Sequence, residues 1–323
     1  MPSSDARAFW IAAPGRGEIR AEPLRDAAPD EVAVRTLFSG VSRGTESVVF
    51  HGRVPASERQ RMRAPFQAGD FPAPVKYGYA CVGLVESGPP ELAGQTVFVL
   101  HPHQTRFLVP AAAAHVVPPA VPPARAILAA NLETAINGVW DADVRAGDRV
   151  TVVGGGVVGC LVAWIASRTP GVDVELVDVN PQRAATAHAL GVAIAWPDTA
   201  RGDRDIVFHA SATESGLRQA LTLAAFEATI VELSWYGDRC VSLPLGEAFH
   251  SRRLTLKSSQ VGAVSPLKRA RWDHRRRMAF ALALAADPSL DALISGESEF
   301  DALPEVMPSL ADGDALCHRI RYV

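Results

Sequence analysis

The chain has 323 residues, of which 48% are apolar and 21% are charged, and this composition excludes a disordered or fibrous protein. Its net charge of -3 provides no general attraction to nucleic acid or to an anionic membrane surface. We therefore expect two globular domains that act on a small molecule, with no nucleic-acid and no membrane partner.

The compartment is predicted from features that are missing. The first residues, MPSSDARAFW, lack the basic segment and long apolar run of a secretory signal, and no stretch is long enough to span a bilayer. Four cysteines, Cys81, Cys160, Cys240 and Cys317, are scattered without the Cys-x-x-Cys spacing of a zinc knuckle or redox pair. A cytoplasmic protein without structural zinc is the expectation.

Up to about Val121 the chain consists of short alternating segments separated by proline and glycine. Four segments are typical of strands, at residues 31–42, 79–86, 95–100 and 105–110. Two proline-rich segments, 55–74 and 116–123, are typical of loops. This pattern predicts a β-barrel or β-sandwich.

From Ala124 the pattern changes to strand, turn, helix and strand, which predicts a parallel sheet. Strands are expected at 150–153, 174–178, 205–210 and 228–234, with a helix at 217–225. From Pro266 we expect one or two helices and a terminal strand at 317–323. The predicted domains are therefore 1–123, 124–265 and 266–323.

The sequence Gly154-Gly155-Gly156-Val157-Val158-Gly159 follows the first of these strands and opens a helix. In such a motif Gly154 permits the tight turn, Gly156 lets the backbone approach a pyrophosphate, and Gly159 lets helix and strand pack closely. The N–H groups of the helix N-terminus, around Val157 and Val158, face the phosphates. We predict a dinucleotide-binding loop, the alternative being a glycine-rich turn of another α/β protein.

The second strand ends in Asp178, nineteen residues after Gly159, where a carboxylate accepts hydrogen bonds from the adenosine ribose. It would repel a 2'-phosphate, so NAD is expected rather than NADP. The strand tips 209–211 and 234–236 are predicted to line the nicotinamide half of the cleft; Ser211 has helix capping as its alternative role. The predicted cofactor-binding set is Gly154, Gly156, Val157, Val158, Gly159, Asp178, Arg183, Arg43, Ser211 and Ser234.

This order of parts resembles the medium-chain dehydrogenase/reductase superfamily over essentially the whole chain. The segments 40–46 (GVSRGTE), 76–83 (KYGYACVG), 131–138 (NLETAING) and 252–262 (RRLTLKSSQVG) are similar to the bacteriochlorophyllide a dehydrogenase type of zinc-alcohol-dehydrogenase-like proteins. The resemblance implies an α/β protein with a GroES-like β-barrel domain and a doubly wound Rossmann nucleotide-binding domain. It also implies a C-terminal segment that returns to the first domain, and a homodimer, with the strand around Val231 as a partner edge.

Zinc members of the superfamily have a cysteine after the Gly-Val or Gly-Ile of the first segment and Gly-His-Glu in the second. Here Ser42 or Arg43 stands at the first position and Gly78-Tyr79-Ala80 at the second, so that only Glu133, a third ligand in some relatives, could still coordinate. We expect no catalytic zinc. His101 and His103 have two interpretations. They could bind a metal at a different position, or they could be histidines of a surface loop.

Without a metal, hydride transfer at a carbinol needs a side chain that moves the hydroxyl proton. Tyr79, at the vacated ligand position, is the first candidate, with Lys76 as the ammonium that would lower its pKa if the chain turns at Gly78. Ser42 joins this catalytic set. The alternative is that the tyrosines only fill the emptied pocket.

Other candidates also carry two interpretations. Arg43 would contact the cofactor pyrophosphate or be an exposed loop arginine, and Glu133 would be a proton relay or a helix N-terminal acid. Thr45 and Glu46 are expected to hold their loop by local hydrogen bonds. The basic run 268–277 would place Lys268, Arg271 and Arg275 on one helical face, either for an anionic substrate or as a solvated surface.

These observations predict an NAD-dependent oxidoreductase that transfers hydride between nicotinamide and a secondary alcohol or ketone. The resemblance suggests a bulky ring-bearing substrate, with the cofactor in the crevice between the two domains. Two alternatives remain: a non-catalytic NAD(H)-binding redox module, and a zinc-independent quinone-type reductase, against which Asp178 argues because such enzymes usually prefer NADPH.

Overall fold

The computed structural model describes residues 5–322, and the chain divides into two compact units. Unit 1 comprises residues 1–130 and 278–323, and unit 2 comprises residues 131–277. Both divisions fall within helices, α3 (Ala129–Ala142) and α7 (His274–Leu284). Residues 1–4 of the segment considered as a secretion signal, and Val323 of the expected last strand, lie outside the described residues.

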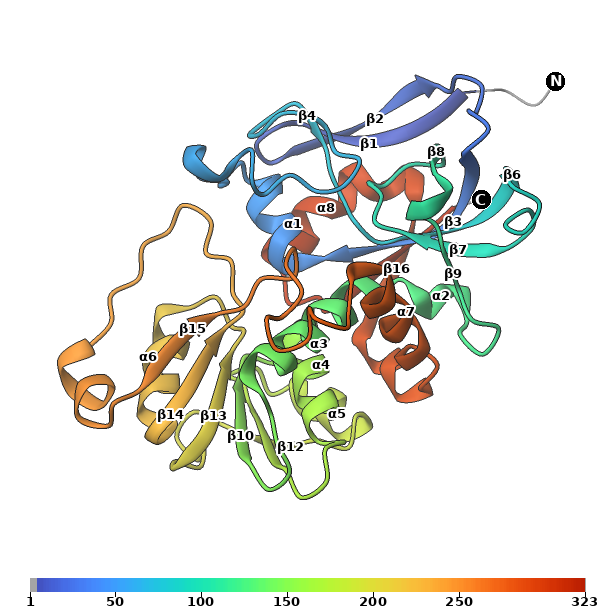
Figure 1. Ribbon diagram of the computed structural model, residues 1–323. Coiled ribbons are helices and arrows are strands. Elements are labelled where there is room, and N and C mark those ends of the chain that lie inside the picture. Colours follow the sequence, from blue (N-terminus) through green and yellow to red (C-terminus); the bar gives the residue numbers. More distant parts are fainter. Residues whose placement is uncertain (1–4, 323) are drawn as a thin grey trace. The chain divides into compact units, whose positions relative to one another are not determined.

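Unit 1 is built mainly from short strands, drawn in blue and teal in Figure 1 together with the dark red C-terminal strands. Its elements in chain order are β1 (Asp5–Ala13), β2 (Arg16–Pro23), β3 (Glu31–Ser42), α1 (Arg43–Phe50), β4 (Ala68–Gly69), β5 (Val75–Lys76), β6 (Cys81–Ser87), β7 (Thr96–Val99), β8 (Arg106–Pro110), β9 (His115–Val116), α2 (Pro123–Ala126), β16 (Ile294–Glu299), α8 (Leu303–Asp312) and β17 (Cys317–Arg321).

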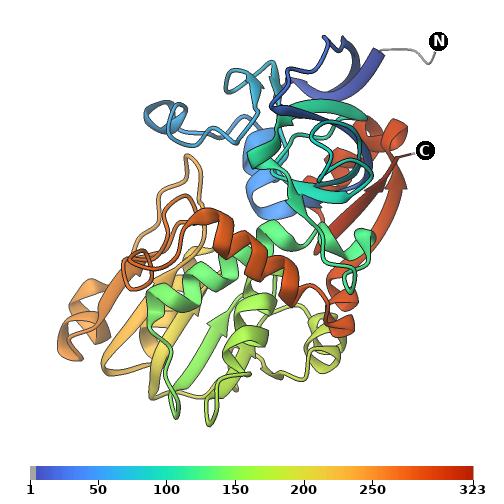
Figure 2. The ribbon, with the colours of Figure 1, turned by 45° about the vertical axis from the view of Figure 1, so that its right-hand side comes forward.

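Strand β3 organises unit 1. It pairs antiparallel with β6, β8 and β17, within a sheet of order β16-β17-β3-β6-β7-β9. The C-terminal strand therefore enters the same sheet as the N-terminal half, with Cys317 opposite Ser42. The strands of this unit curve round one another in Figure 2. Strands 31–42, 96–99 and 106–110 agree with those expected from alternation.

The core of this sheet follows from the alternation in β3. Inward-facing Val32 and Val34 are buried and pack with Val97 of β7 and Phe107 of β8. Because successive side chains of a strand point to opposite faces, this pattern places one face in the core. The β1–β2 hairpin, residues 5–23, was not predicted, and it forms a second sheet with β4 and β5.

Unit 2 contains one parallel sheet of order β12-β11-β10-β13-β14-β15. Read as the chain order of its strands this is 3-2-1-4-5-6, the doubly wound Rossmann arrangement. Its elements are β10 (Arg149–Val153), α4 (Val157–Ala166), β11 (Asp173–Val177), α5 (Arg183–Ala189), β12 (Ala193–Ala195), β13 (Arg204–His209), α6 (Glu214–Leu223), β14 (Ala224–Glu232), a π-helical turn (Leu245–Phe249) and β15 (Thr255–Ser258).

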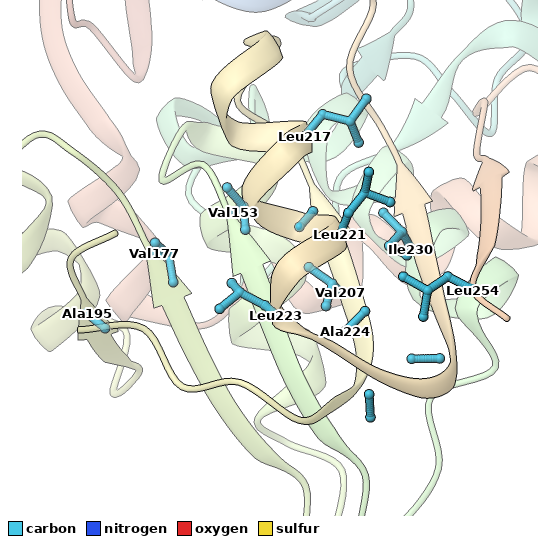
Figure 3. Packing of buried hydrophobic residues seen from close by; sticks show 13 residues of the cluster. Val153, Val177, Ala195, Val207, Leu217, Leu221, Leu223, Ala224, Ile230 and Leu254 are labelled. Atoms are coloured by element: carbon cyan, nitrogen blue, oxygen red, sulfur yellow. The ribbon is translucent and has the colours of Figure 1, made fainter. Parts of the chain in front are cut away.

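Helix α6 covers one face of this sheet. Leu217 and Leu221 on the helix point toward Val153, Val207 and Ile230 of the strands, as Figure 3 shows. All five side chains are buried, so the sheet and helix share one apolar core. The strands match the expected ones, except that 224 and 225 begin β14 rather than end α6.

The sheet order corrects one expectation about assembly. Val231 lies in β14, which pairs with both β13 and β15, so its strand is interior to the sheet and offers no free edge. Strand β15 is the edge on that side. Among the described residues no helix is both long and apolar enough to cross a lipid bilayer.

Candidate functional site

The glycine loop of unit 2 has the conformation that its sequence predicts. Gly154 has a φ of +111°, which favours glycine, and a Cβ at Gly159 would lie 1.9 Å from the Gly154 carbonyl oxygen. A Cβ at Gly156 would meet nothing within 4 Å, so the space in front of this residue is open. Gly156 also precedes α4, whose first N–H groups, at Val157 and Val158, lack intrahelical acceptors. The arrangement fits a pyrophosphate.

Asp178 lies just beyond β11 and is joined to this loop. Its carboxylate accepts the Gly155 N–H at 2.5 Å and the Asn180 N–H at 2.7 Å. Arg183 is buried at the start of α5. It lies beside Gly155, where a Cβ would come within 3.3 Å of the Arg183 Cγ. The structure therefore brings Asp178 and Arg183 together with the glycine loop, as predicted for the adenosine side of a dinucleotide site.

At the carboxyl ends of β13 and β14 lies a polar cluster that includes the predicted strand tips, but the sequence did not reveal Glu232 or the contacts within the cluster. His209 and Glu232 are register partners, and Nδ1 of His209 is 2.8 Å from Oε2 of Glu232. Nε2 of His209 is 2.6 Å from Oγ of Ser211. The signal was present as a histidine and a glutamate at matching ends of adjacent predicted strands, but it required the strand register to be recognised.

Ser211 and Ser234 follow strands β13 and β14, and Ser211 does not cap helix α6. Thr213 is the N-cap of α6, and its hydroxyl accepts the Gly216 N–H, so the capping interpretation of Ser211 is wrong. Ser234 Oγ accepts the Ala212 N–H at 3.1 Å. Both serines lie at the predicted strand tips.

Glu232 is held as a carboxylate. Burial alone would raise the pKa of Glu232, but hydrogen bonds from His209 and Ser234 outweigh burial and lower this pKa. The Tyr236 hydroxyl also donates to Glu232 at 3.0 Å, and burial together with that carboxylate raises the pKa of Tyr236.

The candidate acid–base residue of unit 1 is Tyr79, which follows β5 in an irregular stretch. Its half-buried phenol hydrogen-bonds with the side chains of Ser42 and Thr45. Burial and the nearby Glu46 carboxylate nevertheless raise the pKa of Tyr79. Glu46 accepts the backbone N–H of Ser42 at 2.8 Å, which confirms that Glu46 holds this loop. The phenol therefore keeps its proton at neutral pH.

The expected partnership of Lys76 with Tyr79 is wrong. Gly78 has a φ of +132°, so the required turn exists, but Lys76 Nζ lies 2.6 Å from Glu22 Oε2 and 2.8 Å from Gln104 Oε1. Glu22, which offsets the charge of this ammonium, belongs to the β1–β2 hairpin that the sequence did not predict. Lys76 therefore does not lower the pKa of Tyr79, which shifts in the opposite direction.

His103 and His101 are buried, so their interpretation as surface-loop histidines is wrong. His103 hydrogen-bonds with Ser39 and with Glu46, at 2.7 Å and 2.9 Å. A Cβ at Gly78 would lie 2.9 Å from Cδ2 of His103, so glycine is needed where this ring packs. Burial lowers the pKa of His101 to about 3, and its ring stacks on Phe107.

Glu133 lies in the second turn of α3 rather than the first, so it is not a helix N-terminal acid. Its Oε1 accepts from Nε of Arg277 at 3.0 Å, in an ion pair whose side chains are 6% and 1% exposed. Burial raises the pKa of Glu133 against the effect of Arg277. Arg277 also binds the Val261 carbonyl and Asn137, and so links residues 261–265 to α3.

The basic run does not form one helical face. Lys268 and Arg271 lie in turns, and α7 begins only at His274, after Asp273, whose carboxylate accepts the Arg276 N–H. Lys268, Arg271 and Arg275 therefore do not share one helical face. Arg43, the first residue of α1, is half-buried and donates to the Gly313 carbonyl at 2.7 Å, so it is not an exposed loop arginine.

A catalytic zinc centre needs three protein ligands and an open position. Within residues 5–322 no three His, Cys, Asp or Glu side chains are placed to hold a metal ion. Tyr79 and Ser42 offer only hydroxyl groups, and the Glu133 carboxylate is paired with Arg277. These donors do not fit a four-coordinate zinc.

No family model matches the chain. The methylenetetrahydrofolate–tRNA-(uracil-5-)-methyltransferase TrmFO of Anaeromyxobacter sp. (strain Fw109-5) is 31% identical over 174 residues, which are 51% of this chain and 34% of that protein. The matched part of this chain thus spans about a third of the length of that relative.

Solved structures match over nearly the full length. L-idonate 5-dehydrogenase of Escherichia coli has a TM-score of 0.81 at 15% identity, covering 98% of both chains. A protein of Sinorhizobium meliloti bound to NADP, described as a zinc-binding dehydrogenase, has a TM-score of 0.79 at 20% identity, covering 99% of this chain and 100% of the other. 2R,3R-butanediol dehydrogenase of Bacillus subtilis has a TM-score of 0.76 at 16% identity, covering 98% and 99%. The predicted fold, GroES-like unit plus Rossmann unit, is confirmed.

Proposed function

We propose that this protein is an NAD-dependent oxidoreductase that transfers hydride between nicotinamide and a secondary alcohol or ketone. The observation that carries the proposal is the hydrogen bond from the Gly155 N–H to Asp178, at the glycine loop of a sheet with Rossmann strand order. The dehydrogenases that share the fold support it.

The residues that would hold the dinucleotide lie in unit 2. The open space at Gly156 and the first N–H groups of α4 suit a pyrophosphate, and Asp178 suits the ribose hydroxyls. A carboxylate at this position disfavours a 2'-phosphate, so we propose NAD rather than NADP. When bound, the nicotinamide supplies a hydride acceptor or donor.

Tyr79 is the proposed proton-transfer residue. Its hydrogen bonds with Ser42 and Thr45 orient the phenol, and its raised pKa keeps the proton on Oη near neutral pH. This state suits donation of a proton to a ketone oxygen, so we propose that Tyr79 acts as the general acid in reduction, with Ser42 as its orienting partner. Because the donor set does not fit zinc, we propose that the reaction needs none.

The substrate class rests on the sequence resemblance. The segments similar to the bacteriochlorophyllide a dehydrogenase type, within a branch that lacks catalytic zinc, suggest a hydroxyalkyl group on a bulky ring system. An anionic substrate is part of the proposal. The basic residues expected to bind it do not share one helical face: Lys268, Arg271 and Arg275.

Assembly and compartment are also proposals. A second copy of the chain would pair at β15, which is the edge strand of the sheet next to β14. Such strand addition is a common mode of association. We propose a cytoplasmic homodimer, and light scattering would test the dimer directly.

The function is tested by NADH formation from NAD with a panel of cyclic and aryl secondary carbinols, in the presence of a chelator, with NADH binding by fluorescence as the control. Turnover that survives the chelator supports the proposal. Turnover that requires added zinc contradicts the metal-free mechanism.

The second candidate is a non-catalytic NAD(H)-binding module. It is favoured by the ion pair of Arg277 with Glu133, because this pair engages the carboxylate that was considered as a proton relay. NADH binding without turnover of any carbinol or ketone, with or without zinc, would support this candidate. A quinone-type reductase would be recognised by a preference for NADPH, against which Asp178 argues.

A further inference from the structure

Unit 2 contains a cavity of about 430 Å³, lined by the end of helix α3, the turn after it and strands β13, β14 and β15. These three strands lie side by side in Figure 1. Ile206, Thr229 and Thr255 in the lining are register partners on the three strands. Register partners of parallel strands point to the same face of a sheet, so these side chains form one row across the cavity floor. A volume of this size suits a small molecule.

The cavity lies at the opposite edge of the sheet from the glycine loop. Thr255 is the first residue of β15, and Asp148, also in the lining, directly precedes β10. The glycine loop, residues 154–159, follows the other end of β10. All strands of this sheet are parallel, so their starts share one edge and their ends the other. The cavity is therefore separate from the expected dinucleotide site, which lies at the strand ends.

One side of the cavity offers hydrogen-bond donors. Lys257 follows Thr255 by two residues in β15, so its side chain lies on the same face. Its ammonium donates to the Asp141 carbonyl at 2.5 Å and has no carboxylate partner among residues 5–322. Within the same residues, the hydroxyls of Thr229 and Thr255 have no hydrogen-bond partner. An ammonium beside two such hydroxyls suits a carboxylate.

The other side of the cavity offers acceptors. Asp148 accepts the Arg145 N–H at Oδ2, 2.7 Å away, and its Oδ1 makes no hydrogen bond within the described part of the chain. Asp143 forms an ion pair with Arg145 through Oδ2. The lining includes four aspartates but only two basic residues. A ligand that carries only negative charge is therefore disfavoured, whereas one that also carries an ammonium suits the aspartates.

Apolar side chains complete the lining. Ile206 is buried in the floor, Ala142 ends α3, and Leu267 is 52% exposed. An apolar group in the cavity would remove the surface of Leu267 from water, which stabilises the bound state. The cavity thus combines donors for a carboxylate, acceptors for an ammonium and an apolar wall.

We propose that this cavity binds an α-amino acid with an apolar side chain. Lys257, Thr229 and Thr255 hold its carboxylate, Asp148 accepts a hydrogen bond from its ammonium, and its side chain covers Leu267. The amino acid takes no part in hydride transfer, because it binds at the opposite edge of the sheet from the glycine loop. The site is therefore independent of the proposed function.

Titration calorimetry on the 323-residue chain, without any nicotinamide, tests the site with L-leucine and L-methionine as probes. N-acetyl-L-leucine lacks the ammonium, and 3-methylbutan-1-amine lacks the carboxylate. L-leucine and L-methionine should bind saturably, and each analogue should bind at least about tenfold more weakly than L-leucine, because it loses charge-assisted hydrogen bonds. The proposal is overturned if neither amino acid binds, or if either analogue binds as tightly as L-leucine.

A double variant locates the bound amino acid. Thr229→Val with Thr255→Val removes both hydroxyls at little change of side-chain shape, and should weaken L-leucine binding about tenfold or more. Thr151→Val is the matched control, because Thr151 is the register partner of Val207, which packs on the face of the sheet that α6 covers. This variant should bind L-leucine as wild type does. Wild-type affinity in the double variant would place the amino acid elsewhere and overturn the assignment of this cavity.

Discussion

His103 and Glu46 form a buried hydrogen-bonded pair, with Nε2 of His103 2.9 Å from Oε2 of Glu46 and side chains that are 1% and 4% exposed. Glu46 accepts a hydrogen bond from the Ser42 N–H, and the His103 ring packs on Gly78. The pair therefore joins the segment at Ser42 to the segment at Gly78. It therefore sets the relative position of the two segments on either side of Tyr79.

His103→Ala should lower the free energy of unfolding by about 3 kcal/mol, because it leaves Glu46 buried without its partner. Urea unfolding monitored by circular dichroism measures this change. The control is His51→Ala, which breaks the exposed pair of His51 with Asp312 and should cost less than about 1 kcal/mol. Equal losses in the two variants would mean that the buried pair adds nothing.

Tyr79→Phe should reduce turnover roughly a hundredfold or more, since the hydroxyl that carries the proton is removed. NADH binding by fluorescence should stay at the wild-type level. Tyr77→Phe is the matched control, because it removes the phenol of a buried neighbour whose ring lies edge-on to Tyr79. Wild-type turnover in Tyr79→Phe would leave the phenol as a packing group.

Asp178→Ala should shift cofactor preference toward NADP, because the carboxylate that opposes a 2'-phosphate is lost. The ratio of kcat/KM for NADP to that for NAD should rise about tenfold or more. It should also weaken NAD binding, since Asp178 holds the Gly155 N–H. Asp198→Ala, at an exposed position of the same unit, is the control and should leave the ratio unchanged.

Arg277→Met should lower the free energy of unfolding by about 3 kcal/mol, because Glu133 would remain buried without its cation. The double variant Arg277→Met, Glu133→Leu should recover most of this loss, since both charges are then removed. Urea unfolding compares the three proteins. If Glu133→Gln keeps turnover while Arg277→Met is unstable, the pair is structural; loss of turnover in a stable Glu133→Gln would restore Glu133 as a proton relay.

The buried thiols predict a loss of stability at high pH. Burial raises the pKa of Cys160 from 9.0 to about 12, so the folded state favours the neutral thiol. This stabilisation is complete below pH 9 and disappears as the pH rises toward 12, on the order of 1 kcal/mol for each pH unit. Urea unfolding between pH 7 and 10.5 should show a shallower decline in Cys160→Ala than in wild type. Cys240→Ala, at an exposed thiol, should follow wild type.

Segments with a strong local pattern were predictable. Residues 31–42 form β3 as expected, because alternation along a strand is a local property. The strand, glycine loop and helix around Gly154 followed for the same reason. The hairpin of β1 and β2 was missed, and the helix expected over the basic run begins only at His274, where Asp273 caps it.

The sequence by itself determined the fold class and the place of the glycine loop, because both depend on spacings of a few residues that dictate local backbone geometry. Only the tertiary structure decided which charged groups meet. Lys76 meets Glu22, His103 meets Glu46, Glu133 meets Arg277, and His209 meets Glu232. These partners are far apart in the chain, and their contacts arise from strand register and packing, which a local pattern does not specify. Burial and the Glu46 carboxylate raise the pKa of Tyr79, and both are consequences of the tertiary structure.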